Sequence, residues 1–214
     1  MRLDRAGWPF IGGALLIALA SAVAVGWVLA LPLTALAAFL AFFFRDPQRI
    51  APAGPHLVLS PADGRVLVAG EATADAAPPG AWRQISIFLS PMDVHVNRIP
   101  ASGRVTRVTY RPGRFLPAYR PDAATANERS EVWIDHGGQT IVARQIVGML
   151  ARRVVCRVQS GADVQAGDRF GIMKFGSRMD VFLPINATIK VEVGQVVRGG
   201  ETVIAVLQSN ESIG

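Results

Sequence analysis

The amino-acid sequence carries, at residues 6–44, the stretch AGWPFIGGALLIALASAVAVGWVLALPLTALAAFLAFFF, which contains no Asp, Glu, Lys or Arg. About 20 helical residues are enough to cross the hydrocarbon core of a bilayer, so this stretch is too long for one span. It predicts two apolar helices that form a hairpin, with the break at Gly26-Trp27 or at Leu31-Pro32.

Basic residues flank the apolar stretch at both ends. Arg2 and Arg5 precede it, and Arg45 and Arg49 follow it, so a hairpin brings all four to the same side. The positive-inside rule assigns that side to the cytoplasm. We therefore expect the protein at the cytoplasmic face of the inner cell membrane, where Arg45 and Arg49 would meet anionic head groups.

Two other membrane arrangements fit the same residues. A cleaved signal peptide would use Met1–Arg5 as its charged region and Ala20–Ala22 as its cleavage site, but the apolar run continues far beyond that site, to Phe44. A monotopic hairpin would enter only one leaflet. Whether the hairpin spans the membrane or dips into it stays open at this point.

The composition limits the class of protein. The 214 residues are 50% hydrophobic and 18% charged, which excludes a disordered chain and leaves room for one domain and an appendage. The net charge of +6 accompanies an apolar segment, which favours an anionic lipid surface over nucleic acid. Cys156 is the only cysteine, so we expect no internal disulfide, no cysteine-based metal cluster and no bound metal.

After the apolar stretch the sequence changes to short segments rich in Val, Ile and Thr, separated by Gly and Pro. This pattern predicts a mainly β domain, a barrel or a sandwich, over residues 51–214, following a membrane-associated hairpin and basic flank over residues 1–50. The predicted strands are 65–69, 84–89, 103–110, 131–135, 140–147, 152–158, 170–174, 180–183, 188–193 and 201–207, and the predicted loops are 71–81 and 116–127.

A weak internal repeat near the end of the chain refines the fold class. Residues 164–172 and 196–204 share a valine, a glycine turn and an apolar strand. This pattern of glycine turns and apolar strands is typical of a hammerhead or biotinyl/lipoyl-type β fold, although any two β-hairpins with glycine turns would show it.

Two of the three polar clusters in the β domain also fit ordinary turns. In the first, residues 59–66, Asp63 is followed by Gly64 after a proline, which is a turn signal. In another, residues 171–184, Gly176 and Ser177 separate two apolar strands. That pair is not the nucleophile elbow of a hydrolase, because residues 174–178 contain only one glycine, and it is in the wrong place.

The remaining cluster, residues 88–100, surrounds a histidine with polar groups. Asp93, His95, Asn97 and Arg98 lie close together between prolines. The other histidines of the chain lie in a linker and in a turn. His95 is therefore a candidate general base, and a structural hydrogen-bonding role is its alternative.

These clusters and their order resemble the phosphatidylserine decarboxylase family, in its short proenzyme form. The resemblance covers nearly the whole chain. It rests on Phe43-Phe-Arg-Asp-Pro47, Ser60-Pro-Ala-Asp-Gly64, Ser90-Pro-Met-Asp-Val-His-Val-Asn-Arg98, Asn127-Glu-Arg129, Gln145-Ile-Val-Gly148 with Ala151-Arg-Arg153, and Phe175-Gly-Ser-Arg178. Any one of these motifs is weak, but six in order are hard to produce by chance.

The resemblance implies an enzyme whose pyruvoyl group is made from its own chain. In the family, the serine matching Ser177 attacks the carbonyl of the preceding residue, here Gly176, and the chain is cut into a β chain, residues 1–176, and an α chain, residues 177–214, which stay associated. The pyruvoyl group left at position 177 forms a Schiff base with the amine of phosphatidylserine. Carbon dioxide then leaves, and phosphatidylethanolamine is the product.

The resemblance also implies roles for other residues. His95 matches the base of self-cleavage, oriented by Asp63 in a Ser-His-Asp relation, and the proton donor of decarboxylation. Longer family members have a second histidine where this sequence has Arg98, and an arginine there could pair with the phosphate or carboxylate of the head group. Arg98 and Asn127 are the candidate substrate-binding residues.

The expected partner is phosphatidylserine in the bilayer, nucleic acid is not expected, and self-association is left open. Two alternatives belong to other classes. A membrane-anchored carrier or binding module of the biotinyl/lipoyl type would be modified on Lys174 and would not cleave itself. A membrane-anchored structural protein would need neither Ser177 nor His95.

Overall fold

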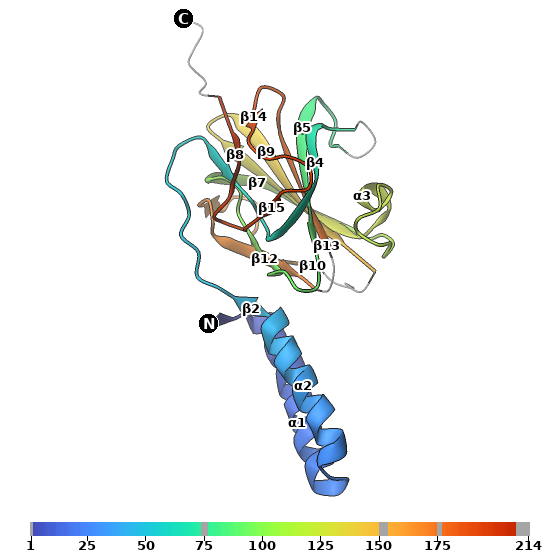
Figure 1. Ribbon diagram of the computed structural model, residues 1–214. Coiled ribbons are helices and arrows are strands. Elements are labelled where there is room, and N and C mark those ends of the chain that lie inside the picture. Colours follow the sequence, from blue (N-terminus) through green and yellow to red (C-terminus); the bar gives the residue numbers. More distant parts are fainter. Residues whose placement is uncertain (1, 74–76, 150–153, 175–176, 209–214) are drawn as a thin grey trace, which may run out of the picture. The chain divides into compact units, whose positions relative to one another are not determined.

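Two units follow each other along the chain, Met1–Gln48 and Arg49–Gly214. The computed structural model describes residues 2–73, 77–149, 154–174 and 177–208. The first unit is an apolar helix pair and the second is a mainly β domain, as the sequence predicted (Figure 1). Arg49, expected in the flank of the hairpin, belongs to the β unit.

The first unit is a hairpin of α1 (Trp8–Ala24) and α2 (Trp27–Phe43), preceded by the 3-10 turn η1 (Arg5–Gly7). The chain reverses at Gly26, whose φ of +109° strains any residue with a side chain. Pro32 lies inside α2 without ending it. Of the two predicted break positions, the glycine is therefore the one that is used.

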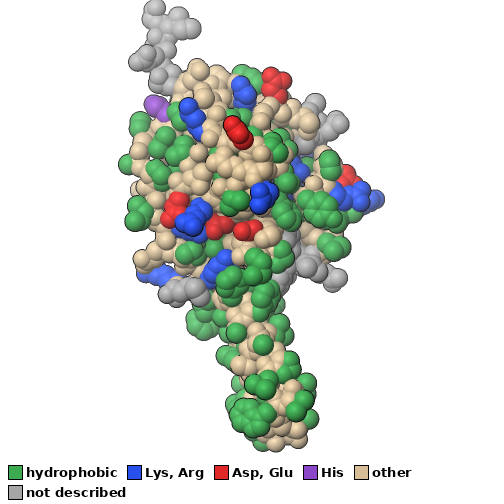
Figure 2. All heavy atoms as spheres, in the orientation of Figure 1, with side chains coloured by type: hydrophobic (Ala, Val, Ile, Leu, Met, Phe, Trp, Pro, Cys, Tyr) green, Lys and Arg blue, Asp and Glu red, His purple; other side chains and the backbone are tan. Residues whose placement is uncertain are grey.

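Alanines fill the contact between the two helices. Ala14 and Ala18 of α1 and Ala30 and Ala37 of α2 are buried, whereas most of the large apolar side chains face outward. Small residues let two helix backbones approach closely, which is typical of packing inside a membrane. Figure 2 shows the outward face of the pair covered by apolar side chains. The helical stretch Arg5–Ala24 is long and apolar enough to cross a membrane, and α2 is a shorter apolar helix.

The two ends of the hairpin are joined at its base. β1 (Arg2–Leu3) pairs antiparallel with β2 (Arg45–Asp46), and the N–H of Asp4 donates to the carbonyl of Phe44 at 2.8 Å. The basic residues before and after the apolar stretch, Arg2 and Arg45, thus lie at the same end of the hairpin.

The β domain is built on one eight-stranded antiparallel sheet, curled into a half-barrel, in the order β11-β7-β8-β9-β13-β5-β4-β15. Two three-stranded sheets, β10-β12-β6 and β14-β16-β3, complete the domain (Figure 1). The elements are β3 (Leu57–Leu59), β4 (Gly64–Glu71), β5 (Trp82–Leu89), β6 (Val96–Arg98), β7 (Gly103–Arg111), α3 (Ala123–Ala126), β8 (Arg129–His136), β9 (Gln139–Val147), β10 (Val154–Cys156), β11 (Asp163–Val164), β12 (Arg169–Met173), β13 (Ser177–Pro184), β14 (Thr188–Ile189), β15 (Val196–Val197) and β16 (Val203–Val206).

Each predicted strand has a counterpart among these elements, although residues 152–153 of one prediction lie outside the described residues. The sequence missed β3, β6, β11 and β15, because two or three residues are too few to show an alternating pattern. The predicted loop at 116–127 contains the short helix α3.

The inner face of the large sheet packs on the two small sheets around one apolar core. Along β13, Met179, Val181 and Leu183 belong to this core. Because side chains alternate along a strand, Ser177 points to the same inner face, and Arg178 points to the outer face.

Gly64→Ala should destabilise the β domain. The φ of Gly64 is +152°, and an added Cβ would lie 2.1 Å from the carbonyl oxygen of Phe88 in β5, so the backbone would have to shift. We expect the free energy of unfolding to fall by about 2–4 kcal/mol, as measured by denaturant unfolding in detergent.

Gly70→Ala is the matched control in the same strand. An added Cβ at Gly70 has nothing within 4 Å, so the free energy of unfolding should change by less than about 1 kcal/mol. Equal losses in the two variants would contradict the steric argument.

Candidate active site

Ser177 is the first residue of β13 and lies between two neighbouring strands. It pairs with Leu89 of β5 and with Val147 of β9. Its side chain is fully buried, and its Oγ has no hydrogen-bond partner among the described residues. Buried hydroxyl groups normally have a partner, so this one is a candidate for chemistry. Gly176, the other half of the predicted cleavage site, lies outside the described residues.

His95 lies in the loop that joins β5 to β6, next to the end of β12. Its main-chain oxygen accepts a hydrogen bond from the N–H of Met173 at 3.3 Å. The loop itself starts after Leu89, the register partner of Ser177. The loop thus starts beside Ser177 and is bound at its other end to the end of β12, and the imidazole of His95 is fully buried.

The hydrogen bond at Nδ1 fixes the form of the His95 ring. Nδ1 lies 3.0 Å from the main-chain oxygen of Asp93. Because a carbonyl oxygen can only accept, a neutral His95 carries its hydrogen on Nδ1. Nε2 is then the unprotonated nitrogen, which carries the lone pair that a general base requires.

Asp63 belongs to an ion-pair network in the turn between β3 and β4. Its Oδ2 lies 2.7 Å from Nη2 of Arg49, and its Oδ1 accepts the N–H of Gly199 at 2.7 Å. Arg49 also pairs with Glu201 at 2.8 Å. Burial raises the pKa of Asp63 above its ordinary value, and the neighbouring Asp93 adds to this, while the bonds from Gly199 and Arg49 oppose it.

Asp63 and His95 thus use different hydrogen-bond partners, Arg49 and Gly199 for the carboxylate and Asp93 for the imidazole. The orienting role of Asp63 stays a prediction. Arg49 is bound to two carboxylates of the β domain and is only 10% exposed, so the basic flank expected to meet lipid head groups loses this residue.

The two candidate substrate-binding residues differ in the hydrogen bonds that they make within the protein. Arg98 is 5% exposed and donates to the carbonyl of Gly167 at 2.9 Å, at the edge of a 220 Å³ pocket that Arg49 and Arg169 also line. Asn127 donates both amide hydrogens to main-chain oxygens, those of Leu116 and Val147. Asn127 therefore positions the residue paired with Ser177 and has no amide hydrogen left for a substrate.

Two buried amides on the inner side were not identified as site residues from the sequence. Nε2 of Gln145 donates to Oδ1 of Asn97 at 2.8 Å, and Gln145 pairs in register with Met179, on the same face as Ser177. Nδ2 of Asn97 and Oε1 of Gln145 have no partner in the described part of the chain. Both residues lie within the motifs of the family resemblance, which was the available signal. Within the described ranges, no three His, Cys, Asp or Glu side chains are grouped to hold a metal.

Comparison with known proteins assigns the chain to a class. The sequence model of the phosphatidylserine decarboxylase family matches residues 36–205. A phosphatidylserine decarboxylase proenzyme of Nitrosomonas europaea is 43% identical over 95% of this chain and 94% of its own length. Proteins with the same name are 44% identical in Burkholderia ambifaria, over 96% of both chains, and 46% identical in Pelodictyon phaeoclathratiforme, over 78% of both chains.

These matches show that the protein is an enzyme of the decarboxylase class. The chain belongs to the phosphatidylserine decarboxylase family. The carrier module and the structural anchor considered from the sequence find no support in these comparisons.

The raised pKa of Asp63 predicts how stability depends on pH. A carboxyl group whose pKa is higher in the folded protein contributes its full stability below the ordinary value of 3.8 and loses it as the pH rises through the raised pKa. The free energy of unfolding of the native protein should therefore fall, relative to Asp63→Asn, as the pH rises from about 3 to about 7.

Asp122→Asn provides the control, because a hydrogen bond from Arg120 lowers the pKa of this exposed carboxyl group. The change with pH in the free energy of unfolding of the native protein relative to Asp122→Asn should be small and of opposite sign. Denaturant unfolding in detergent at several pH values measures both. If the native protein instead became more stable relative to Asp63→Asn as the pH rises, the Arg49 ion pair would outweigh the effect of burial on the pKa of Asp63.

Proposed function

We propose that the protein decarboxylates phosphatidylserine to phosphatidylethanolamine and CO2, after cutting its own chain between Gly176 and Ser177. The observation that carries the proposal is the fully buried Ser177, whose Oγ lacks a hydrogen-bond partner among the described residues. The name proenzyme, given to its relatives, is consistent with a precursor that is processed.

In the proposed self-cleavage, Oγ of Ser177 attacks the carbonyl carbon of Gly176. His95 Nε2 accepts the hydroxyl proton and returns it to the amide nitrogen, so that an ester replaces the peptide bond. Loss of the α-proton of residue 177 then breaks its Cβ–O bond and releases the carboxylate of Gly176. This elimination leaves a dehydroalanine at position 177. Water hydrolyses it to the pyruvoyl group, and its nitrogen leaves as ammonia.

A pyruvoyl group formed at position 177 would supply a carbonyl that binds the substrate amine and withdraws electrons while CO2 leaves. His95 holds the proton that replaces the lost carboxylate. The buried amides of Asn97 and Gln145, with one donor and one acceptor unpaired among the described residues, provide polar contacts for the head group on the same face of the sheet. Arg98 is the candidate for its phosphate.

The fold supports association of the two chains after cleavage. β13 begins at Ser177 and is paired on both sides, with β5 and with β9, by strands that precede the cut. Its side chains Met179, Val181 and Leu183 are fully buried in the core. The α chain would thus stay in the sheet by hydrogen bonding and apolar burial, without a covalent link.

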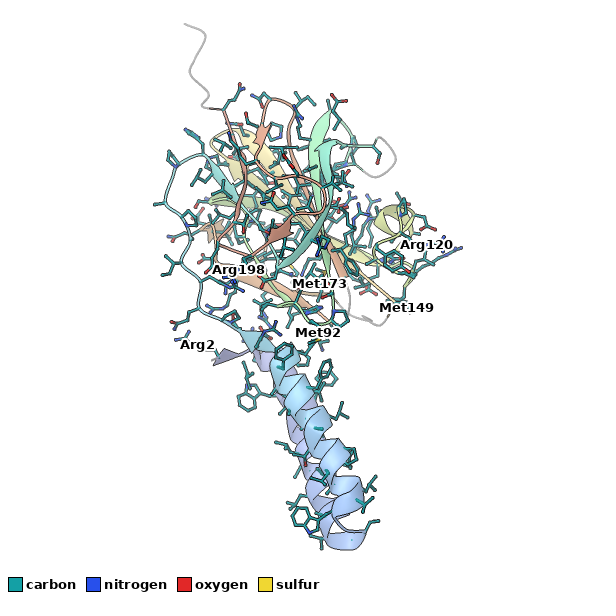
Figure 3. All side chains as sticks on the ribbon, viewed as in Figure 1. Arg2, Met92, Arg120, Met149, Met173 and Arg198 are labelled. Atoms are coloured by element: carbon teal, nitrogen blue, oxygen red, sulfur yellow. The ribbon has the colours of Figure 1, made fainter. Side chains whose placement is uncertain are left out.

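Access for a lipid is suggested by exposed apolar residues at the end of the sheet where Ser177 lies. Met92, in the loop after β5, is 60% exposed, and Met149, after β9, is 61% exposed. Both strands end beside Ser177, and Figure 3 labels both methionines along one edge of the β domain. We propose that this edge of the β domain meets the cytoplasmic face of the membrane, so that the head group reaches the site while both acyl chains stay in the bilayer.

Ser177→Ala should remain one chain of 22.8 kDa and have no decarboxylase activity, because the attacking hydroxyl is removed. His95→Gln should leave the chain largely uncut, since removal of a general base typically costs about 10²–10⁴ in rate. Intact mass after purification measures both results.

Ser160→Ala is the control for loss of a hydroxyl group, because Ser160 is exposed and its Oγ accepts the N–H of Val108. It should mature like the native chain. A cut and active Ser177→Ala protein would disprove the proposed mechanism.

Met92→Gln with Met149→Gln should lower turnover of phosphatidylserine in vesicles by about tenfold, because two apolar contacts with the bilayer are lost. Turnover of a short-chain soluble analogue should stay within about twofold. Ile185→Gln, a 49% exposed residue just beyond the other end of β13, is the control and should change neither rate. Equal losses on both substrates would mean that the methionines act on the chemistry or the fold and not on membrane contact.

A further inference from the structure

The outer face of the large sheet carries a pocket of about 530 Å³ lined by four arginines. Arg107 and Arg111 come from β7, Arg129 from β8 and Arg144 from β9. We call this the arginine pocket. Its volume is within the usual range of about 300–1,000 Å³ for small-molecule sites.

The arginine pocket lies on the opposite face of the sheet from Ser177. Arg144 pairs in register with Asp180 of β13 and with Glu131 of β8, and paired residues share a face. Asp180 is three positions after Ser177, an odd spacing that places the two side chains on opposite faces. The pocket is therefore separate from the candidate active site, and the proposed decarboxylation does not use it.

Positive charge in the arginine pocket is only partly balanced. Glu131 is the one carboxylate among its described lining residues, and Arg144 binds it at 2.8–2.9 Å. The other oxygen of Glu131 accepts from Trp133 Nε1 at 3.2 Å. Three further arginines thus share one pocket with a carboxylate that is already bound.

Of the four arginines, Arg129 has the strongest indication of anion binding. Its Nε is buried and has no hydrogen-bond partner among the described residues, while its Nη1 donates to the carbonyl of Thr125. Burial lowers the pKa of Arg129, and the like charges of Arg144 and Arg111 lower it further. A buried donor without a partner, beside like charges, is relieved by an anion.

Arg107 shows how the pocket holds its guanidinium groups in place. Its guanidinium carbon lies 3.8 Å from the centre of the Trp133 ring, in a cation–π contact. A stacked guanidinium presents its N–H groups in a fixed plane, which suits bidentate binding of a phosphate or carboxylate. A contact between two copies of this face would instead bring like charges together.

We propose that the arginine pocket is a second binding site, for an anion that carries a phosphate ester. Several arginines converging on a cavity of this size match a doubly charged group with several acceptor oxygens better than a single carboxylate. The ester comes either from a soluble phosphate compound or from the head group of an anionic lipid. The two sources share the chemistry and are separated by experiment.

The test uses the full-length protein in nonionic detergent. Isothermal titration calorimetry with glycerol 3-phosphate probes the soluble source, and titration with detergent micelles containing short-chain phosphatidylglycerol probes the lipid source. Arg111→Gln and Arg129→Gln should each weaken binding by about tenfold or more, because each removes a charge-assisted contact. Thermal unfolding of each variant checks that it is folded.

Arg104→Gln is the matched control, because Arg104 is an exposed arginine of the same strand β7 that does not line the pocket. It removes the same charge and should leave the affinity within about twofold. Saturable binding of either probe that is lost in Arg111→Gln and Arg129→Gln supports the site and identifies the source. Absence of binding, equal losses in Arg104→Gln, or a charge-independent self-association through this face would overturn the proposal.

Discussion

The pairing of β13 on both of its edges is the constraint on which the rest of the structure depends. All eight of its residues pair with β5, and its first six pair with β9 on the other side, so the strand cannot slide without breaking both ladders. A shift by one residue would move Ser177 to the outer face and a charged residue into the core. The position of the serine, and of the loop that carries His95, follows from this register.

The same alternation divides the large sheet into two faces with different chemistry. On the inner face, the buried polar groups near Ser177, those of Asn97 and Gln145, stand out against an apolar core. On the outer face, Arg178 and Asp180 form a buried ion pair at 2.6 Å. Burying charges is costly unless they are paired and hydrogen-bonded. Arg178 also donates to Oγ of Ser86 at 2.9 Å, whereas Oδ2 of Asp180 has no partner among the described residues.

Burial also explains why single side chains cannot be assigned roles from their type. Arg49 belongs to the basic flank in sequence, yet it lies in the β unit between Asp63 and Glu201. Asn127 lies in a motif of the family, yet its amide hydrogens bind main-chain oxygens. In both cases the side chain binds residues that are distant in sequence, and these bonds use the donors that the sequence suggested for a ligand.

The sequence by itself determined the division into an apolar hairpin and a β domain, because an uncharged stretch and alternating Val and Ile residues are local patterns. It also supplied Ser177, His95 and the family through motifs. Only the tertiary structure decided which hairpin break is used, what Asp63 binds, and that four arginines from three strands share one pocket. Those features depend on contacts between residues far apart in the chain, and on the register of paired strands, which no local pattern encodes.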